Sequence, residues 1–385
     1  MRIGIDIRPL LEPYPSGIVL YTMELVRHLV EVDTENEYLL FYNAFQKNYR
    51  LLELKKIFEK QHVHIMPFSL PNKIFNSAQI FFGFPAIDTM IGGVDVFFAP
   101  NWGFMSVSRK CRFVVTAHDL ATRLYPQFLS LKGKLWHACI RPKHFFQRAD
   151  HIIAVSYHTK KDLITEYQIP EAKISVIYSG ADHLKITHEA LQDGKSLVED
   201  GIQKKYKLPK HYVLMFGAEH PRKNFEAVCE AFQRLQHTAS ITKLYPNLTL
   251  VVIGKLPQKY KHSIPWVQCI GYIPEQDKYS LYRRAHILMY PSYYEGFGFP
   301  PLEAALAGTP AIVSCVSALP EVMDRSAVYV QPYHVAHIHN ALELLLTNGE
   351  MRNTLITRGR RLAKQFTWQD TAQKTRNILE YAYRH

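Results

Sequence analysis

Cysteine is scarce in this chain and shows no pairing pattern. The five cysteines are odd in number and scattered, and none lies in a C-x-x-C pair: they are Cys111, Cys139, Cys229, Cys269 and Cys315. This usage counts against a disulfide framework and against a cysteine zinc site. It predicts reduced, mostly buried thiols in a cytoplasmic protein.

Long apolar runs are also missing. No stretch of about 18 uninterrupted apolar residues suggests a membrane span. The first residues, Met1 to Ile7, read directly as a strand, without an apolar leader and a small-residue cleavage site. We therefore expect a soluble protein, with peripheral contact at the inner face of the membrane as a further expectation.

Three phosphate-related motifs do not occur. The sequence has no G-x-x-x-x-G-K-[ST] loop and no G-x-G-x-x-G after Ile7, which counts against ATPases and dehydrogenases. It also has no Asp-x-Asp triplet, so a metal-clamped diphosphate is not indicated. We predict that the protein uses no metal ion and no cofactor.

Acidic residues are absent between Asp119 and Asp150, although the segment is rich in basic and aromatic ones. The net charge of the chain is +12. One interpretation of the segment is a solvated amphipathic helix with an aromatic face toward the core. Another is a surface for anionic lipid headgroups or a phosphate-linked acceptor. Because no nucleic-acid-binding motif accompanies the charge, we expect no nucleic-acid partner. The residues concerned are Arg123, Lys132, Lys134, Arg141, Lys143, Arg148, Phe128, Trp136, Phe145 and Phe146.

What the chain does have is an alternation of short apolar runs with longer amphipathic stretches. With 385 residues, 47% of them hydrophobic, it can build two cores. Strands alternating with helices indicate βαβ units and parallel sheets. The α/β fold class predicted is two Rossmann-like, doubly wound parallel-sheet domains facing a central cleft. The expected strands are 3–7, 38–42, 62–66, 95–99, 112–116, 152–155, 175–178, 212–216, 248–253, 267–270, 286–290, 311–314 and 327–330, and the expected helices include 18–32, 129–148, 334–347, 351–366 and 368–383.

The pattern breaks once, which suggests the domain boundaries. We predict an N-terminal Rossmann-like domain over residues 1–182 and a polar linker over 183–209. The C-terminal Rossmann-like domain would span 210–367. The final segment, 368–385, would be a helix that packs back on the first domain.

The most specific constellation runs from Pro291 to Pro310. A strand ends near Tyr290, a glycine loop follows, and a helix begins at two prolines, where the missing N–H groups cost nothing. The glycines of this loop let the backbone approach a ligand, and the helix start attracts phosphate. Glu295 and Glu303 could each accept from two neighbouring hydroxyls of a sugar or a ribose.

Three further segments also follow strands or open helices. Arg222 and Lys223 lie after the first strand of the second domain, where two cations can neutralise a diphosphate. His118 and Asp119 end a buried strand; a structural role and a cap compete there with catalysis. Gly17 opens the first helix, where a plain N-cap by Ser16 competes with a ligand contact.

These segments together resemble family 4 of the retaining glycosyltransferases over essentially the whole chain. The resemblance rests on Ser156–Leu163, Val176–Asp182, Pro221–Asn224 and the E-x7-E segment from Glu295 to Glu303. It implies the GT-B fold, with an acceptor-binding N-terminal domain and a C-terminal domain for the nucleotide-sugar donor. It also implies that His118, Glu295, Arg222 and Lys223 act at the reacting centre. The sequence as a whole is similar to those of mannosyltransferases of bacterial surface polysaccharide synthesis. The donor would then be GDP-mannose, with a UDP-sugar as the other candidate, and the acceptor a glycan or a lipid-linked glycan.

The resemblance also implies a role for each matching residue. Glu295 would bind hydroxyls of the donor sugar and Glu303 those of the ribose, while Leu302 would offer its N–H to the diphosphate. The base would lie near Tyr272, and His118 beside the reacting carbon. The remaining donor-side residues would be Gly17, Gly296, Phe297, Gly298 and Phe299, and the acceptor-side residues Asn101, Trp102 and Asp119.

One departure from the family pattern concerns the first loop. The family often has G-G-x-G there, whereas Ser16-Gly17-Ile18-Val19 keeps one glycine. The bulky Val19 restricts close backbone approach, so Gly17 can shape the acceptor side instead. Two other readings stay open for the whole chain: a nucleotide-sugar epimerase or hydrolase on the same fold, and a non-catalytic sugar- or lipid-binding subunit.

Overall fold

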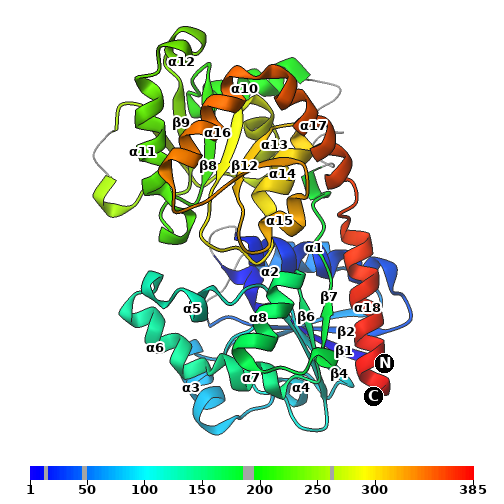
Figure 1. Cartoon of the computed structure of the whole chain (residues 1–385). Coiled ribbons are helices and arrows are strands. Elements are labelled where there is room, and N and C mark those ends of the chain that lie inside the picture. Colours follow the sequence, from blue (N-terminus) through cyan, green and yellow to red (C-terminus); the bar gives the residue numbers. More distant parts are fainter. Residues whose placement is uncertain (13–15, 46–49, 185–194, 261–263) are drawn as a thin grey trace. The chain divides into compact units, whose positions relative to one another are not determined.

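The structure is a computed structural model that describes residues 1–12, 16–45, 50–184, 195–260 and 264–385. The chain forms two compact units (Figure 1). The N-terminal unit comprises residues 1–180 and 368–385, and the C-terminal unit comprises residues 181–367. Each unit has its own sheet and its own buried core.

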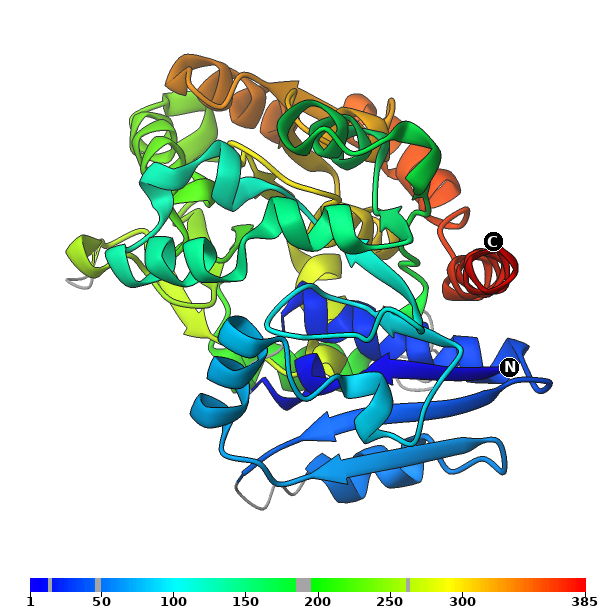
Figure 2. The same cartoon turned by 90° about the horizontal axis from the view of Figure 1, so that it is seen from below.

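The N-terminal unit is built on a seven-stranded sheet of order β3-β2-β1-β4-β5-β6-β7. Every pairing in it is parallel, as the alternation of strands and helices predicts (Figure 2). The strands are short and mostly buried, as strands covered on both faces must be. They are β1 (Arg2–Asp6), β2 (Glu37–Asn43), β3 (Val63–Phe68), β4 (Val96–Ala99), β5 (Arg112–Ala117), β6 (His151–Ala154) and β7 (Ile174–Val176).

The first helix of this unit, α1 (Gly17–Val32), buries one apolar face. Its buried positions include Leu25 and Leu29, four residues apart, and Ser16 caps the start by accepting from the N–H of Val19. The other helices are α2 (Arg50–Ile57), α3 (Asn72–Phe82), α4 (Ile87–Met90), α5 (Ala121–Leu124), α6 (Leu131–Ile140), α7 (Pro142–Arg148), α8 (Tyr157–Tyr167) and α18 (Trp368–Arg384), with the 3₁₀ turns η1 (Arg8–Leu11), η2 (Pro126–Phe128) and η3 (Glu171–Lys173).

The single helix predicted over residues 129–148 is wrong, because the segment forms two helices. Arg141 separates α6 from α7 and has a left-handed backbone with φ of 51°. Pro142 follows at the first position of α7. A proline ring excludes the helical conformation for the residue before it and lacks the N–H that a continuous helix needs. Pro142 was the signal for this break.

The C-terminal unit contains a six-stranded parallel sheet of order β10-β9-β8-β11-β12-β13. Its strands are β8 (Tyr212–Phe216), β9 (Thr249–Ile253), β10 (Val267–Gly271), β11 (Ile287–Tyr290), β12 (Ala311–Ser314) and β13 (Ala327–Val330). Its helices and 3₁₀ turns are α10 (Lys195–Tyr206), η4 (Pro221–Lys223), α11 (Phe225–Gln236), α12 (Ala239–Leu244), η5 (Gln258–Tyr260), α13 (Glu275–Arg284), α14 (Phe299–Ala307), α15 (Leu319–Met323), α16 (Val335–Thr347) and α17 (Gly349–Ala363).

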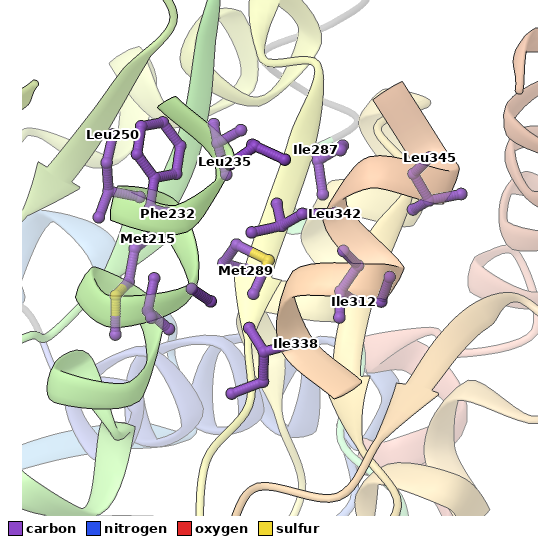
Figure 3. Close-up of a cluster of buried hydrophobic side chains, with 14 of the residues drawn as sticks. Met215, Phe232, Leu235, Leu250, Ile287, Met289, Ile312, Ile338, Leu342 and Leu345 are labelled. Atoms are coloured by element: carbon purple, nitrogen blue, oxygen red, sulfur yellow. The ribbon is translucent and has the colours of Figure 1, made fainter. Parts of the chain in front are cut away.

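One core of the C-terminal unit lies where α11 and α16 cover the sheet (Figure 3). Phe232 and Leu235 of α11 meet Leu342 and Leu345 of α16 over the strand residue Met289, and all five are at most 1% exposed. Burying such a side chain contributes about 1.5–3 kcal/mol. This packing fixes the two strands that carry the candidate site, β8 and β11.

The predicted linker, 183–209, falls within the C-terminal unit. Residues 185–194 lie outside the described part of the chain. Of the rest, α10 packs on α13, where the Lys205 ammonium lies 2.6 Å from the Asp277 carboxylate. The unit begins at Ala181, two residues before the predicted start of the linker.

The final helix, α18, belongs to the N-terminal unit. Trp368 is fully buried and its ring meets that of Tyr21 in α1 at 5.8 Å. A Cβ added at Gly180 would lie 2.4 Å from the backbone nitrogen of Trp368, so this close approach requires glycine. Further along α18, Arg376 pairs with Asp33 and Glu35 at the end of α1.

Two expectations about the surface can be checked. No helix in the described ranges is long and apolar enough to cross a membrane. The prediction of mostly buried thiols is wrong for two of the cysteines: Cys139 and Cys269 are exposed.

Candidate active site

Two neighbouring strands of the C-terminal unit position the residues that the sequence singled out. β8 and β11 pair in parallel, with Met215 opposite Met289. Both strands therefore end at the same edge of the sheet, which is where α/β sheets bind ligands. The loop after β8 carries Arg222 and Lys223, and the loop after β11 carries Glu295.

Glu295 is clamped between the two cations. One carboxylate oxygen, Oε2, lies 2.7 Å from Arg222 Nη1, and the other, Oε1, lies 2.7 Å from Lys223 Nζ. Glu295 is only 6% exposed. Two cations against one anion leave the cluster with a net positive charge, as a site for an anionic group needs.

The ion pairs keep Glu295 ionised. Burial alone would raise the pKa of its carboxyl group, but Arg222 and Lys223 outweigh burial and lower the pKa to about 2. At neutral pH Glu295 is therefore a carboxylate and has no proton to give. Since each oxygen accepts from a cation, it is also a weak nucleophile.

Backbone and side-chain contacts hold the three residues in place. Arg222 Nη1 also donates to the carbonyl of Tyr294 at 2.6 Å, and Lys223 Nζ lies 4.3 Å from the centroid of the Tyr290 ring. Burial and the charge of Glu295 raise the pKa of Tyr290 well above its usual value, so this phenol stays neutral. The N–H of Glu295 donates to Ser317 Oγ at 2.9 Å. Such fixed geometry limits the reorganisation that binding would require.

Asn224 ties the two loops together. Its buried amide donates to the carbonyl of Pro291 at 3.2 Å and to that of Pro332 at 2.6 Å. The residue has φ of 61°, a left-handed conformation that asparagine tolerates better than most residues. This explains why the Pro-Arg-Lys turn ends in asparagine.

The glycine loop leads into α14 with its side chains turned inward. Gly298 has φ of 104°, and an added Cβ would lie 2.7 Å from the Leu319 side chain, so only glycine fits. Phe297 is 6% exposed and packs on Phe299 and Phe366 at ring distances of 5.4 and 5.9 Å. Because the Phe297 side chain is engaged in this packing, only its backbone is available for the predicted contact with a ligand.

The contacts of Glu303 differ from the ribose contact that the resemblance implies. It is the fifth residue of α14, beyond the first turn, and it is fully buried. Its Oε2 accepts from the Tyr282 hydroxyl at 2.6 Å. Its Oε1 lies 3.1 Å from His183 Nε2 and 3.3 Å from Lys278 Nζ. A ribose hydroxyl can reach this carboxylate only if one of these partners moves.

The surroundings of Glu303 also keep it ionised. Burial would raise the pKa of its carboxyl group, but Lys278, His183 and Tyr282 lower it to about 2. His183, Glu275 and Glu303 have ligand atoms within 4.8 Å of one another, close enough to hold a metal ion. Lys278 lies 2.8 Å from Glu275 and 3.3 Å from Glu303, so its ammonium already pairs with both carboxylates. The expectation that no metal is used stays a prediction.

Tyr272, expected near the base, lies just after β10 and is 39% exposed. Its hydroxyl donates to Glu219 Oε1 at 3.0 Å, and Lys255 lies 5.7 Å from the centre of its ring. An exposed aromatic ring at the carboxyl end of a strand can stack on a nucleobase.

His118 belongs to the N-terminal unit, where it follows β5. Its Nε2 lies 2.8 Å from the carbonyl of Pro100, which can only accept, so Nε2 carries the proton and Nδ1 is an acceptor. Burial lowers the pKa of His118 although Pro100 and Asp119 oppose the shift. The ring meets that of Tyr21 edge-on at 4.7 Å. A neutral imidazole with an acceptor nitrogen can bind a sugar hydroxyl.

The other N-terminal candidates have visible structural roles. Gly17 is the first residue of α1, and the cap by Ser16 is present. Asp119 Oδ1 accepts from the N–H of Ala121 at 2.9 Å, which is the capping role considered for it. Trp102 is covered by Trp136 and His137 at ring distances of 6.3 and 5.4 Å. Asn101, beside it, is partly exposed.

Several residues of the site were not predicted. Tyr290 is the last residue of β11, so its position at a strand end was the available signal. Asn224 ends the Pro-Arg-Lys turn, and its place directly after Lys223 was the available signal. Tyr282 and Lys278 lie on α13, whose sequence reads as an ordinary polar helix. Nothing in the sequence shows that they meet Glu303.

Comparison with known proteins identifies the family of this chain. The family model described as Glycosyltransferase Family 4 matches residues 15–183, and the one described as Glycosyl transferases group 1 matches residues 199–362. The chain is 28% identical over 294 residues to O-antigen chain mannosyltransferase B of Escherichia coli, covering 74% of each protein. It is 29% identical over 237 residues to the serotype-specific mannosyltransferase WbdA of Escherichia coli, covering 59% of this chain and 28% of that protein.

Solved structures share the fold at lower sequence identity. Sucrose-phosphate synthase from Thermosynechococcus elongatus matches with a TM-score of 0.71 and 17% identity, over 100% of this chain and 99% of that one. Anabaena Alr3699/HepE in complex with UDP and glucose matches with a TM-score of 0.68 and 14% identity, over 99% and 100% of the chains. Family models, relatives and fold agree: the chain belongs to glycosyltransferase family 4 and has the GT-B fold.

Proposed function

We propose that this glycosyltransferase moves mannose from GDP-mannose to a hydroxyl group of a glycan or lipid-linked acceptor, with retention of anomeric configuration and without a metal ion. The reaction would serve bacterial surface polysaccharide synthesis. Two relatives named mannosyltransferases, one of them named an O-antigen chain mannosyltransferase, motivate the sugar and the pathway. The observation that carries the proposal is the cluster of Arg222, Lys223 and Glu295 at the ends of β8 and β11.

Arg222 and Lys223 would bind the diphosphate of the donor. Phosphate oxygens are strong acceptors for both side chains, and a bound diphosphate would compete with Glu295 for them. Glu295 would then be released to accept from hydroxyl groups of the sugar. The N-terminus of α14, with the N–H of Leu302, would add further positive potential. In this exchange the resting ion pairs keep the cations in position until the donor arrives.

The transfer step needs no protein nucleophile. The acceptor oxygen forms a bond to the anomeric carbon as the bond from that carbon to the diphosphate oxygen breaks. The acceptor proton passes to the departing phosphate on the same face, which preserves the configuration. Glu295 would not serve as the attacking group, because after the exchange its carboxylate oxygens would accept from hydroxyl groups of the sugar. His118, with Nδ1 as an acceptor, would hold a hydroxyl of the donor sugar.

A UDP-sugar is the second candidate donor. The structure of Anabaena Alr3699/HepE contains UDP and glucose, although its likeness to this chain is one of fold alone. In this chain Tyr272 is suited to stacking, which does not distinguish the bases. Base identity must therefore be measured.

A thermal-shift panel with GDP, UDP, ADP and their sugar conjugates tests the donor. A ligand at about 100 times its dissociation constant adds roughly 2.7 kcal/mol of stability. We expect the largest shift with GDP-mannose. Radiolabelled GDP-mannose, with and without a glycan acceptor, then distinguishes transfer from reaction of the donor alone.

Each outcome bears on one of the competing readings. Label that appears in the acceptor supports transfer, and the anomeric configuration of the product tests retention. Free mannose or an epimerised donor, formed without acceptor, would favour a hydrolase or an epimerase. Binding of a donor with no reaction in either assay would favour a non-catalytic subunit.

A further inference from the structure

Large apolar side chains gather on the surface of two helices of the N-terminal unit. On α3 and the turn after it, Phe81, Phe82 and Phe84 are 74%, 83% and 70% exposed, and on α6 Leu131 and Leu135 are 85% and 67% exposed. Ile74 of α3 and Trp136 of α6 are also exposed. A contiguous apolar patch of this kind usually marks an interaction site.

The two helices border one hollow. A cavity of about 640 Å³ is lined by residues 79–81 and 83 from α3 and the turn after it, and by residues 138–141 from α6 and its end. Figure 1 shows α3 and α6 next to each other on this unit. Leu131 and Leu135 are four residues apart and so lie on the same face of α6. The apolar side chains of both helices therefore belong to one region of the surface.

α6 is attached to the unit by its other side chains. The Trp136 ring packs on Phe104 at 5.3 Å and on Trp102 at 6.3 Å. Ile140 is buried. Because these residues anchor the helix, the outward position of Leu131 and Leu135 is a property of the fold.

The two segments that carry these helices are basic. Residues 60–87 and 120–149 contain no aspartate or glutamate at all. These two segments contain α3, α6 and α7, and they supply exposed cations at Lys73, Lys132, Lys134, Arg141 and Lys143. An anionic surface is the complementary partner.

We propose that α3 and α6 form a docking surface for a bilayer with anionic headgroups. The surface is defined by Ile74, Phe81, Phe82, Phe84, Leu131, Leu135 and Trp136, with the five cations around it. Apolar side chains would enter the boundary between headgroups and acyl chains while the lysines stay among the phosphates, as interfacial amphipathic helices do. The proposal is independent of which sugar the enzyme transfers.

Other partners fit the surface less well. A protein interface is depleted of lysine at its centre, whereas lysines alternate with leucines here along α6. A nucleic acid would satisfy the cations but leave Phe81, Phe82 and Leu131 in water. A bilayer satisfies both kinds of side chain.

Vesicle flotation with the full-length protein tests the apolar part of the proposal. The wild type should bind vesicles containing phosphatidylglycerol and bind pure phosphatidylcholine vesicles far less. The variant with Phe81→Ser, Phe82→Ser, Leu131→Ser and Leu135→Ser should bind the anionic vesicles on the order of a hundredfold more weakly. A matched variant, with the exposed residues Leu52, Leu244, Tyr333 and Leu344 changed to serine, should bind like the wild type.

A second variant tests the charge. Lys132→Gln, Lys134→Gln, Arg141→Gln and Lys143→Gln together should weaken binding to anionic vesicles on the order of a hundredfold at low salt and have no effect on neutral ones. The salt dependence of the wild type should largely disappear in this variant.

Three results would overturn the proposal: no binding of the wild type to anionic vesicles, equal binding to neutral vesicles, or undiminished binding by either surface variant. If the chain instead self-associates through α3 and α6 and binds no vesicles, the surface is an interface between copies. The thermal response to nucleotides should be the same in all variants. Its absence, with vesicle binding intact, would count against the proposed sugar transfer and leave the docking surface standing.

Discussion

The ammonium group of Lys223 lies 2.7 Å from a carboxylate oxygen of Glu295, 72 residues further along the chain. The two residues meet because β8 and β11 are neighbours in the sheet and end at the same edge. Lys223 and Glu295 are therefore partners in a preassembled charge cluster. The proposed exchange of partners on donor binding makes opposite predictions for the two residues.

Glu295→Gln should separate donor binding from transfer. The substitution keeps the shape of the side chain and removes its charge, so Arg222 and Lys223 lose a competitor for phosphate. We expect the affinity for GDP to stay equal or rise, while sugar transfer falls on the order of a hundredfold or more. Isothermal titration with GDP and a radiolabel transfer assay measure the two quantities. Glu226→Gln is a suitable control, because Glu226 forms an exposed pair with Lys259 in the same unit. A large loss of GDP affinity in Glu295→Gln would contradict the exchange.

Lys223→Ala should weaken binding and transfer together. The diphosphate loses one of its two side-chain cations, and removing such a charge-stabilising group costs on the order of a hundredfold in rate. Lys259→Ala, at an exposed position of the same unit, should leave both quantities unchanged. Near-normal turnover by Lys223→Ala would remove this residue from the mechanism.

Acid should destabilise the C-terminal unit through its two buried glutamates. The pKa values of Glu295 and Glu303 are each lowered from an ordinary 4.5 to about 2 in the folded protein. A lowered pKa means that the folded state binds protons less readily than the unfolded one. The stabilisation is therefore complete above about pH 4.5 and is lost as the pH falls toward 2. Each group contributes about 3 kcal/mol by this difference.

Urea unfolding between neutral pH and about pH 3 measures this effect. The free energy of unfolding of the wild type should fall steeply below about pH 4.5. In Glu295→Gln the slope should be shallower, because one of the two titrating groups is gone, whereas Glu226→Gln should retain the slope of the wild type. Equal slopes in wild type and Glu295→Gln would show that the ion pairs do not stabilise the fold.

Gly180→Ala should loosen α18. The added methyl group would lie 2.4 Å from the backbone nitrogen of Trp368 and 2.6 Å from its ring, so either α18 or the segment around Gly180 must shift. Overpacking of this kind costs about 1–3 kcal/mol, and backbone contacts place this case at the upper end. Gly103→Ala is the control, since nothing lies within 4 Å of its added Cβ. Differential scanning calorimetry should show a lower midpoint for Gly180→Ala only.

The sheets could be predicted well because they are buried on both faces. Each strand predicted from an apolar run overlaps a strand in the structure, and Tyr212–Phe216, Ala311–Ser314 and Ala327–Val330 agree at both ends. Parallel strands covered by helices read as continuous apolar stretches, so the signal is strong. The constellation of Arg222, Lys223 and Glu295 was predictable for a related reason, since strand ends at one edge converge.

Side-chain partners could not be predicted in the same way. That Glu303 is fully enclosed by Tyr282, Lys278 and His183 depends on how α13 packs against α14, and the sequence of α13 shows only a polar helix. The proposed ribose contact of Glu303 therefore rests on resemblance, while its observed contacts are structural. Similarly, the sequence does not show that Trp102 is engaged in an aromatic cluster, whereas the cap formed by Asp119 was one of the roles considered for it.

The attachment of α18 to the N-terminal unit has a consequence for how the protein is made. The N-terminal unit consists of residues 1–180 and 368–385, so its structure is complete only after the whole C-terminal unit has been synthesised. The C-terminal unit, which is continuous in sequence, can finish folding first on the ribosome. Until then the first 180 residues lack Trp368, and the pocket beside Tyr21 and Gly180 stays unfilled. The first part of the chain to be translated is thus the last to reach its final structure.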